Sequence, residues 1–203
     1  MADRYLIPAR SHRVEQTIKR SRFLATATHA PSADEARAFI NAIKAEFPDA
    51  THNCWAFAAG APGDTASVGM SDDGEPHGTA GRPMLNTLLH SDVGEIAVVV
   101  TRYFGGTKLG TGGLVRAYSG MVQAVLETLP TREKVETVTL LASMPYNAVT
   151  RFKLLLPDHE AEVLEETYGT DAEFLLSLPE ERADGFRLAL TELTDGRGTA
   201  EPV

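Results

Sequence analysis

Glu95-Ile-Ala-Val-Val-Val-Thr-Arg-Tyr-Phe-Gly-Gly-Thr-Lys-Leu-Gly-Thr-Gly-Gly-Leu-Val-Arg-Ala-Tyr118 passes from a β-branched run through a glycine-rich loop into a helical pattern. The continuous apolar run at 95–101 is typical of a strand covered on both faces, and such strands lie at the centre of a sheet. Beyond the loop, apolar residues recur at helical spacing until Pro130. These residues are Leu114, Tyr118, Met121, Val122, Val125, Leu126 and Leu129. We therefore expect a central strand, a glycine loop and a long helix in direct succession.

The residues before this unit predict a hairpin and a helix. Residues 14–17 and 23–29 alternate between apolar and polar side chains, as the two strands of a hairpin do. Ser32 and Glu35 form a capping box at the start of a helical pattern that Pro48 ends.

A strand, a long loop and a short helix are predicted next. Residues 51–60 have the pattern of a strand with both faces at least half buried. The segment 61–81 is rich in glycine and proline, which indicates a loop around a short extended piece at 67–70. A short helix follows Pro83. Long loops are where functional residues often lie.

The last third of the chain is predicted to form a second, acidic domain. Residues 1–135 carry 14 Lys and Arg against 14 Asp and Glu, whereas residues 136–203 carry 5 against 14. We place the boundary near residue 135, after the polar and charged segment 131–134. The later elements follow the order βαββα, with strands at 135–144, 161–168 and 172–178 and helices at 146–156 and 183–193. This order predicts a ferredoxin-like domain that lacks, or nearly lacks, its last strand.

Composition excludes several classes of protein. The single cysteine, Cys54, can form neither an internal disulfide nor a thiolate metal cage. The apolar run at 96–100 is far shorter than the roughly 20 residues of a membrane helix, and the N-terminus shows no apolar signal region. We expect a cytoplasmic protein that does not bind membranes. Because residues 136–203 would repel a polyphosphate, any nucleic acid must contact residues 1–135.

The loop at 105–113 is a candidate anion site, with five glycines in nine residues ahead of a helix. Free backbone N–H groups and the positive end of the helix favour an anion, and Arg102 and Lys108 add charge. Neither nucleotide motif is complete, because Thr and Gly follow Gly110 and because Val115 occupies the third glycine position of the dinucleotide fingerprint. The same glycines also suit tight turns and close packing, so both interpretations stay open.

The second candidate loop is Ser71-Asp-Asp-Gly-Glu-Pro-His77, which we call the acidic loop. Its three carboxylates and one imidazole are groups that can hold a divalent cation or perform acid–base chemistry. However, Asp and Gly at these offsets also form ordinary turns that hydrogen-bond their own backbone, and the spacing of a calcium loop is absent. We therefore predict no metal, no cofactor and no catalytic residue, with turn formation as the leading interpretation.

Aromatic and basic side chains of the first domain bear on nucleic-acid binding. Tyr103 and Phe104 follow Arg102 and are candidate platforms for base stacking, although aromatic residues on strands belong to the core more often. The N-terminal stretch contains six basic residues and only two acidic ones, a pattern that also suits a solvated strand edge. They are Arg4, Arg10, Arg13, Lys19, Arg20 and Arg22.

Five motifs mark residues 15–130. They are Ser21-Arg-Phe23, Thr51-His-Asn-Cys-Trp55, Ser71-Asp-Asp-Gly-Glu-Pro76, Gly78-Thr-Ala-Gly81 and the block at 100–118. Together they resemble the IMPACT family, in its bacterial branch. The resemblance implies a first domain with a left-handed βαβ unit, as in ribosomal proteins and translational elongation factor G, followed by a ferredoxin-like domain that resembles another part of that factor. It thus implies an α+β protein with domains at 1–135 and 136–203.

The resemblance also implies a role in translation. Eukaryotic members of the family regulate translation by competing for the ribosome-associated activator of a kinase that senses uncharged tRNA. They carry an additional N-terminal module, whereas the similarity here begins within about fifteen residues of Met1. The family supplies motif positions and no catalytic residues. Our candidate binding residues are Asp72, Asp73, Glu75, Thr79, Gly81, Arg102, Gly105, Gly106, Lys108, Gly110 and Gly112.

Three functional hypotheses follow. The leading one is a non-enzymatic, translation-linked protein that engages RNA, the ribosome or a ribosome-associated protein through the glycine loop, with Arg102 and Lys108 as positive contacts. The alternative is a hydrolase or phosphotransferase whose acidic loop holds a metal beside a phosphate on the glycine loop. Convergence of the two loops would favour the enzyme, and carboxylates turned into backbone would count against it. The third hypothesis is a purely protein-binding module whose loops form the contact face with no anion involved. The sequence leaves the oligomeric state open.

Overall fold

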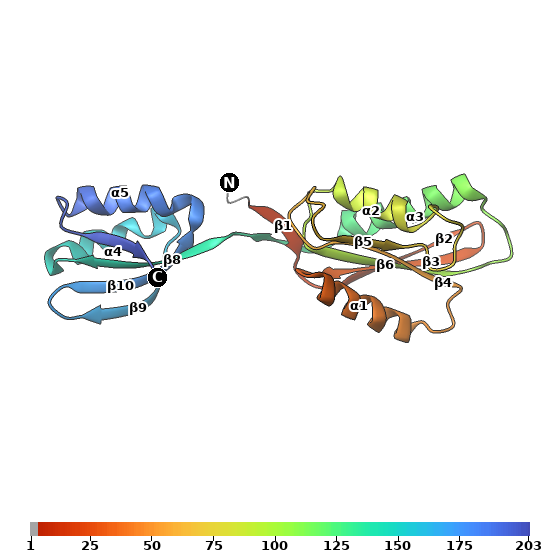
Figure 1. The fold of residues 1–203 in the computed structure, drawn as a ribbon, viewed down its shortest axis with the longest axis horizontal. Coiled ribbons are helices and arrows are strands. Elements are labelled where there is room, and N and C mark those ends of the chain that lie inside the picture. The colour runs from red at the N-terminus through yellow and green to blue at the C-terminus, as the bar shows by residue number, and fades with distance from the viewer. Residues whose placement is uncertain (1–3) are drawn as a thin grey trace. The chain divides into compact units, whose positions relative to one another are not determined.

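The computed structural model describes residues 4–203 and divides them into two units. Residues 5–134 form the N-terminal domain, and residue 4 joins residues 135–203 in the C-terminal domain. Both combine helices with a sheet (Figure 1), which confirms the predicted α+β class. Among the described residues, no helix combines the length and hydropathy that crossing a bilayer requires.

The N-terminal domain is built on a five-stranded antiparallel sheet of order β2-β3-β6-β4-β5. β2 (His12–Ile18) and β3 (Ser21–His29) form the predicted hairpin. β6 (Ile96–Tyr103) lies between β3 and β4 (His52–Ala58), and β5 (Val68–Ser71) lies at the edge. The first seven residues of β6 are buried, so the prediction of a central strand covered on both faces is confirmed.

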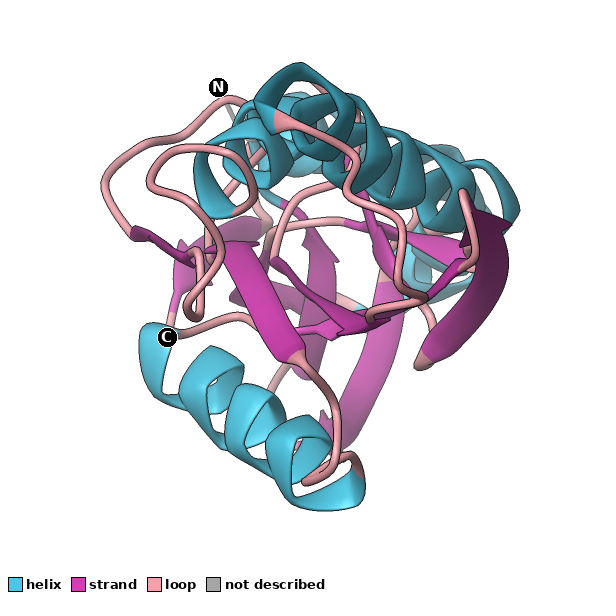
Figure 2. Ribbon diagram, turned by 90° about the vertical axis from the view of Figure 1, so that its right-hand side faces the viewer, coloured by secondary structure: helices cyan, strands magenta, loops and turns pink. Residues whose placement is uncertain are grey.

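Helices cover both faces of this sheet (Figure 2). α1 (Ala33–Glu46) begins at the predicted capping box and packs on one face. α2 (Gly81–Leu89) and α3 (Thr111–Thr128) pack on the other, and the predicted apolar face of α3 joins that core. α2 begins before Pro83, because a proline in the first helical turn removes no helical hydrogen bond.

One short strand pair lies where the sequence predicted no strand. The polar segment before the boundary forms β7 (Thr131–Lys134), which pairs antiparallel with β1 (Tyr5–Pro8). The buried carboxylate of Glu95 ties this pair to the main sheet, because it bonds His29 at 2.7 Å and Lys134. A strand of Thr, Arg, Glu and Lys has no apolar alternation, so no periodicity marks it as a strand.

The C-terminal domain has a complete ferredoxin-like set of elements, with an antiparallel sheet of order β11-β8-β10-β9. Its elements are β8 (Thr137–Met144), η1 (Tyr146–Ala148), α4 (Val149–Leu155), η2 (Pro157–His159), β9 (Glu162–Tyr168), β10 (Ala172–Pro179), η3 (Glu180–Arg182), α5 (Ala183–Leu193) and β11 (Thr199–Pro202). The last strand, predicted to be absent or nearly so, is β11, which pairs with β8. Phe152, Phe174 and Phe186 form the centre of the core between sheet and helices.

Candidate binding site at the glycine-rich loop

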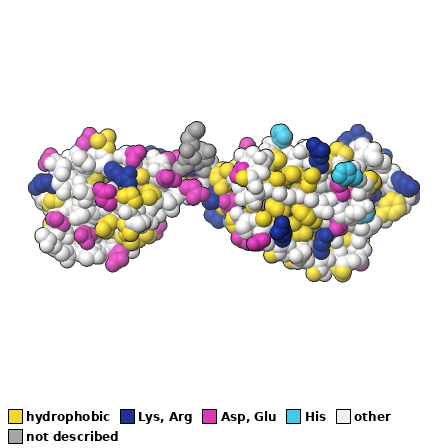
Figure 3. Space-filling model, viewed as in Figure 1, with side chains coloured by type: hydrophobic (Ala, Val, Ile, Leu, Met, Phe, Trp, Pro, Cys, Tyr) yellow, Lys and Arg dark blue, Asp and Glu magenta, His cyan; other side chains and the backbone are white. Residues whose placement is uncertain are grey.

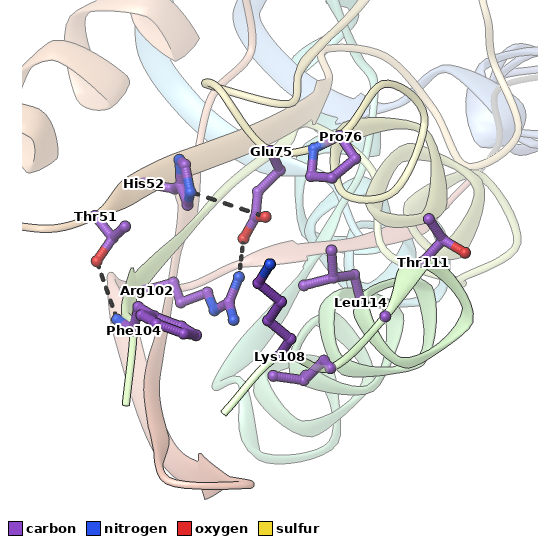
Figure 4. Close-up of a pocket in the computed structure, with 11 residues that line it drawn as sticks. Thr51, His52, Glu75, Pro76, Arg102, Phe104, Lys108, Thr111 and Leu114 are labelled. Atoms are coloured by element: carbon purple, nitrogen blue, oxygen red, sulfur yellow. Dashed lines mark hydrogen bonds and ion pairs between the residues drawn. The ribbon is translucent and has the colours of Figure 1, made fainter. Parts of the chain in front are cut away.

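The acidic loop and the glycine loop meet at a pocket of about 370 Å³ in the N-terminal domain. The acidic loop contributes Glu75 and Pro76, and the glycine loop contributes Lys108 and Gly110. Arg102 lines the pocket from the end of β6. Figure 4 shows Glu75, Arg102 and Lys108 facing one space. The structure therefore brings Glu75 together with Arg102, which lies 27 positions further along the chain, and with Lys108.

Arg102 is buried, with 5% of its surface exposed. Its Nη1 donates to Glu75 Oε1 at 2.5 Å, and its Nη2 donates to Ser21 Oγ at 3.3 Å. The rings of Phe23 and Phe104 have their centroids 5.4 and 5.6 Å from the guanidinium carbon. Its Nε has no hydrogen-bond partner among the described residues. We predicted Arg102 as a positive contact for a partner, and the structure shows its charge paired with Glu75 inside the protein.

Glu75 connects Arg102 to the helix behind the pocket. The hydroxyl of Tyr118, in α3, donates to Glu75 Oε1 at 2.7 Å, and His52 Nε2 lies 3.8 Å from Oε2. Burial raises the pKa of Tyr118 far above its ordinary value, so this hydroxyl stays protonated and remains a donor. Glu75 is thus a hydrogen-bonded part of the fold.

Asp72 is turned into the backbone at the start of α2. It accepts N–H bonds from Gly78 at 2.8 Å, Ala80 at 3.0 Å and Gly81 at 2.9 Å. Burial opposes ionisation of Asp72, but these N–H bonds together outweigh it and hold its pKa below the ordinary value. Asp72 does not line the pocket.

Asp73 joins α1 to β4. Its Oδ1 lies 2.5 Å from Lys44 Nζ, and its Oδ2 accepts the N–H of Asn53 at 2.6 Å. Burial opposes ionisation here too, but the bonds to Lys44 and Asn53 keep the pKa of Asp73 low. Like Asp72, it does not line the pocket.

Three candidate positions serve the packing of the loops. Thr79 is buried and hydrogen-bonds within its own turn. A Cβ at Gly81 would lie 2.8 Å from the backbone of Ser71, and a Cβ at Gly105 would overlap the carbonyl of Arg20. These two glycines therefore permit close approach, as the packing interpretation expected.

The remaining four positions lie on an open surface. A Cβ at Gly106, Gly110 or Gly112 would meet no atom within 4 Å. Gly110 is the N-cap residue of α3 and has no side chain to cap it, so the first N–H groups of α3 are left without a helical or side-chain partner. Lys108 is exposed and has no acidic partner among residues 4–203.

Further cations lie beside this surface. A hollow of about 190 Å³ adjoins the pocket, and Leu109 lines both. Lys19, from the turn between β2 and β3, and Arg116, from α3, line the smaller hollow. Within the described part of the chain neither has an ionic partner, and the same holds for Arg20. The sequence had not singled out Arg116, because only the position of α3 brings it to this side.

We define the basic face as Lys19, Arg20, Phe104, Lys108 and Arg116. All five are exposed, and Phe104 is 47% exposed. Figure 3 shows Lys and Arg side chains at the end of the N-terminal domain that the β2–β3 turn forms. The basic face thus combines unpaired cations, an aromatic ring and the N-terminus of α3.

Comparison with known proteins identifies the family. Residues 19–126 match the model of the Impact N-terminal domain, and residues 143–197 match a domain of unknown function, DUF1949. The chain belongs to the IMPACT family. It is 42% identical to an IMPACT family member of Haemophilus influenzae and 41% identical to the IMPACT family member YigZ of Escherichia coli. Each alignment covers 95% of this chain and 94% of the relative, so the resemblance seen in the motifs is confirmed.

A solved structure supports the fold of this IMPACT family chain. It is the crystal structure of a hypothetical protein, and it matches with a TM-score of 0.68 at 38% identity. The match covers 100% of this chain and 98% of the solved one. The two-domain α+β fold is therefore shared along the whole length.

The geometry of this IMPACT family chain does not favour the enzymatic alternative. The loops converge, but Asp72 and Asp73 are bonded to backbone N–H groups, and Glu75 is bonded to Arg102. Residues 4–203 contain no group of three His, Cys, Asp or Glu placed to hold a metal. Burial raises the pKa of Cys54 to about 12, so its thiol is a poor nucleophile at neutral pH.

Proposed function

We propose that the N-terminal domain binds single-stranded RNA through the basic face, and that the chain acts in translation as a non-enzymatic regulatory binding protein. The observation that carries the proposal is the group of unpaired cations beside an exposed phenylalanine and an uncapped helix N-terminus. Proteins that bind single strands combine these features, with cations along the backbone and aromatic rings under the bases.

Phe104 supplies the stacking platform. Its ring lies at the mouth of the pocket, and the buried Arg102 guanidinium carbon lies 5.6 Å from its centroid. Pro76 and Leu114 add apolar surface to the pocket. A base stacked on an aromatic side chain contributes about 1–3 kcal/mol.

The cations and the helix supply the phosphate contacts. Lys108 lies ahead of the N-terminus of α3, where N–H groups and the helix dipole favour an anion. Lys19 and Arg116 extend the positive surface past Leu109. Arg116, and not Arg102, is the arginine that contacts phosphate, because the charge of Arg102 is already paired with Glu75.

Fluorescence anisotropy of a labelled single-stranded RNA, titrated with the full chain at several salt concentrations, tests the proposal. The double variant Lys108→Ala, Arg116→Ala should bind more weakly and reduce the steepness of the log–log salt dependence by about 1.4, for two phosphates lost. The matched control is Arg10→Ala, Arg132→Ala, which removes two exposed cations of the same domain outside the basic face. Equal effects of the two double variants would refute the placement of the site.

Phe104→Ala separates stacking from charge. It should weaken binding by about 10- to 100-fold, which corresponds to the energy of one stacked base, and leave the salt dependence unchanged. Unchanged affinity would remove Phe104 from the site.

The link to translation rests on the family resemblance, and sedimentation with purified ribosomes tests it. The unmodified chain should co-sediment with ribosomes at low salt, and Lys108→Ala, Arg116→Ala should not. A chain that binds free RNA but never sediments with ribosomes would keep the RNA site and overturn the role in translation.

A further inference from the structure

The C-terminal sheet has an open face that the proposed RNA contact does not use. Because side chains alternate along a strand, the buried Phe174 and Leu176 of β10 face the helices, and Leu175 between them faces away. The strand register places Leu141 opposite Leu175, Glu201 opposite Leu141, and Glu165 opposite Leu175. One row across all four strands therefore reads glutamate, leucine, leucine, glutamate.

Two more glutamates flank this row. Glu173 lies two residues before Leu175, and Glu162 lies opposite Ser177, two residues after it. We call Leu141, Leu175, Glu162, Glu165, Glu173 and Glu201 the acidic sheet face. Its four glutamates are exposed, and within residues 4–203 none has an ion pair or a side-chain hydrogen bond. Strands β8 to β11 contain no Lys, Arg or His.

Several other carboxylates of this domain are ion-paired, whereas within residues 4–203 the four glutamates of this face are not. On the helix side of the same sheet, Glu166 pairs with Lys153 at 2.8 Å. Outside the strands, Glu160 pairs with Arg4 at 2.9 Å and with Arg182 at 3.3 Å. The domain thus pairs several of its other carboxylates and leaves those of the open face free.

We propose that the acidic sheet face docks a protein segment rich in Lys and Arg, with an aliphatic side chain at its centre. Strands lie about 4.8 Å apart, so Glu201 and Glu165 are about 14 Å apart, with the two leucines between them. An extended segment places residues i and i+4 about 13 Å apart on one face, which matches this span. Its central apolar side chain would cover Leu141 and Leu175, and its cations would meet the glutamates.

Charge and composition favour a protein partner over RNA. Four-stranded sheets that bind RNA present aromatic rings to the bases, and single-strand binding surfaces add cations for the phosphates. The acidic sheet face has neither, and its carboxylates repel phosphate. A basic protein segment is the occupant that complements both its charge and its leucines.

The test uses the full chain and a labelled nine-residue peptide with Leu at its centre, Lys at the four alternate positions and Ser between them. This peptide should bind at least about fivefold more tightly than the same peptide with Ser in place of Leu, because only the former covers the leucines. The triple variant Glu165→Gln, Glu173→Gln, Glu201→Gln should weaken binding about tenfold at low salt. The matched triple variant Asp158→Asn, Glu180→Gln, Glu192→Gln should change it less than twofold.

Each contrary outcome overturns the inference. Equal losses for the two triple variants would mean that only net charge attracts the peptide, and equal binding of the two peptides would mean that the leucines are not used. Sedimentation equilibrium addresses a second copy of the chain: a dimer that the Glu165, Glu173 and Glu201 variant dissociates would make that copy the occupant. The same variant should bind RNA as the unmodified chain does, so the failure of this inference and that of the RNA site are distinguishable.

Discussion

At the pocket, Glu75 and Arg102 neutralise each other in buried surroundings, where their side chains are 3% and 6% exposed. Glu75→Gln keeps the shape and an acceptor for Tyr118 but leaves the guanidinium charge unpaired. We expect the free energy of unfolding of the N-terminal domain to fall by about 3–5 kcal/mol. The single tryptophan, Trp55, lies in this domain, so its fluorescence in urea measures the change.

The control for this prediction is Glu15→Gln, which breaks an exposed pair. Glu15 and Arg22 bond at 2.7 Å, with side chains 48% and 50% exposed. Loss of this exposed ion pair should lower the free energy of unfolding by at most about 1 kcal/mol. If Glu75→Gln costs no more than this, the buried pair does not stabilise the domain.

Asp72 gives a pH-dependent prediction. Its pKa in the folded protein lies below the unfolded value, so its stabilising effect is complete above that unfolded value, near 3.9, and is lost as the pH falls through the folded value. Asp72→Asn should therefore cost about 1–3 kcal/mol at pH 7, with a difference from the unmodified chain that shrinks below about pH 4. Urea unfolding monitored by Trp55 at pH 7, 5 and 3 measures it. The control Asp92→Asn, at an exposed aspartate, should show no such dependence on pH. If Asp72→Asn lowers the free energy of unfolding equally at all three pH values, the lowered pKa of Asp72 does not stabilise the fold.

The sequence identified these residues one by one as candidates but did not show which of them pair. Both loops were candidates, but Arg102 and Glu75 are 27 positions apart, and their contact requires the sheet and α3 to be in place. The residues next to an arginine in the sequence do not show that it is buried when the carboxylate that pairs with it lies on another loop. Among residues 4–203, Lys108 is the cation at the pocket without an acidic partner, while Arg102 belongs to the interior.

At the scale of elements, the glycines of the loop before α3 divide into two kinds, and alanine substitution should separate them. Gly105→Ala places a Cβ on the carbonyl of Arg20 and should cost about 1–3 kcal/mol, because the turn between β2 and β3 must move. Gly112 lies in the first turn of α3, where an added Cβ would have no atom within 4 Å. Gly112→Ala should therefore stabilise the domain by about 0.5–1 kcal/mol. Urea unfolding compares the two. Similar costs for both would mean that the packing of Gly105 is not what requires glycine there.

Elements with strong periodicity were predictable, and short polar ones were not. The buried run of β6 and the apolar stripe of α3 have enough residues to fix both type and place. β7 and β11 have four residues each, and neither shows an apolar alternation. Their pairing with β1 and β8 comes from the tertiary fold, which supplies partners that local sequence does not reveal.

At the scale of the whole molecule, each domain has its own core, and the two differ in charge. Residues 1–135 balance 14 basic against 14 acidic residues, whereas residues 136–203 have 5 against 14. Self-repulsion destabilises a domain of high net charge, and salt screens it, with a Debye length that falls from about 30 Å at 0.01 M to about 10 Å at 0.1 M. Added salt should therefore stabilise the C-terminal domain and leave the N-terminal domain nearly unchanged.

Thermal unfolding followed by two signals can resolve this difference. Trp55 fluorescence reports the N-terminal domain, and near-ultraviolet circular dichroism from the stacked pair Tyr146 and Tyr168 contributes a signal from the C-terminal domain. Between 10 mM and 300 mM sodium chloride, the C-terminal midpoint should rise by several degrees, since about 1 kcal/mol shifts the midpoint of a 60–100-residue domain by about 4–8 °C. The triple variant Glu165→Gln, Glu173→Gln, Glu201→Gln should start from a higher midpoint and respond less to salt, because it removes three unpaired charges from one face. If the midpoints from both signals rise equally with salt in the unmodified chain, the two domains unfold as one unit. The repulsion among the C-terminal carboxylates would then lower the stability of the whole chain.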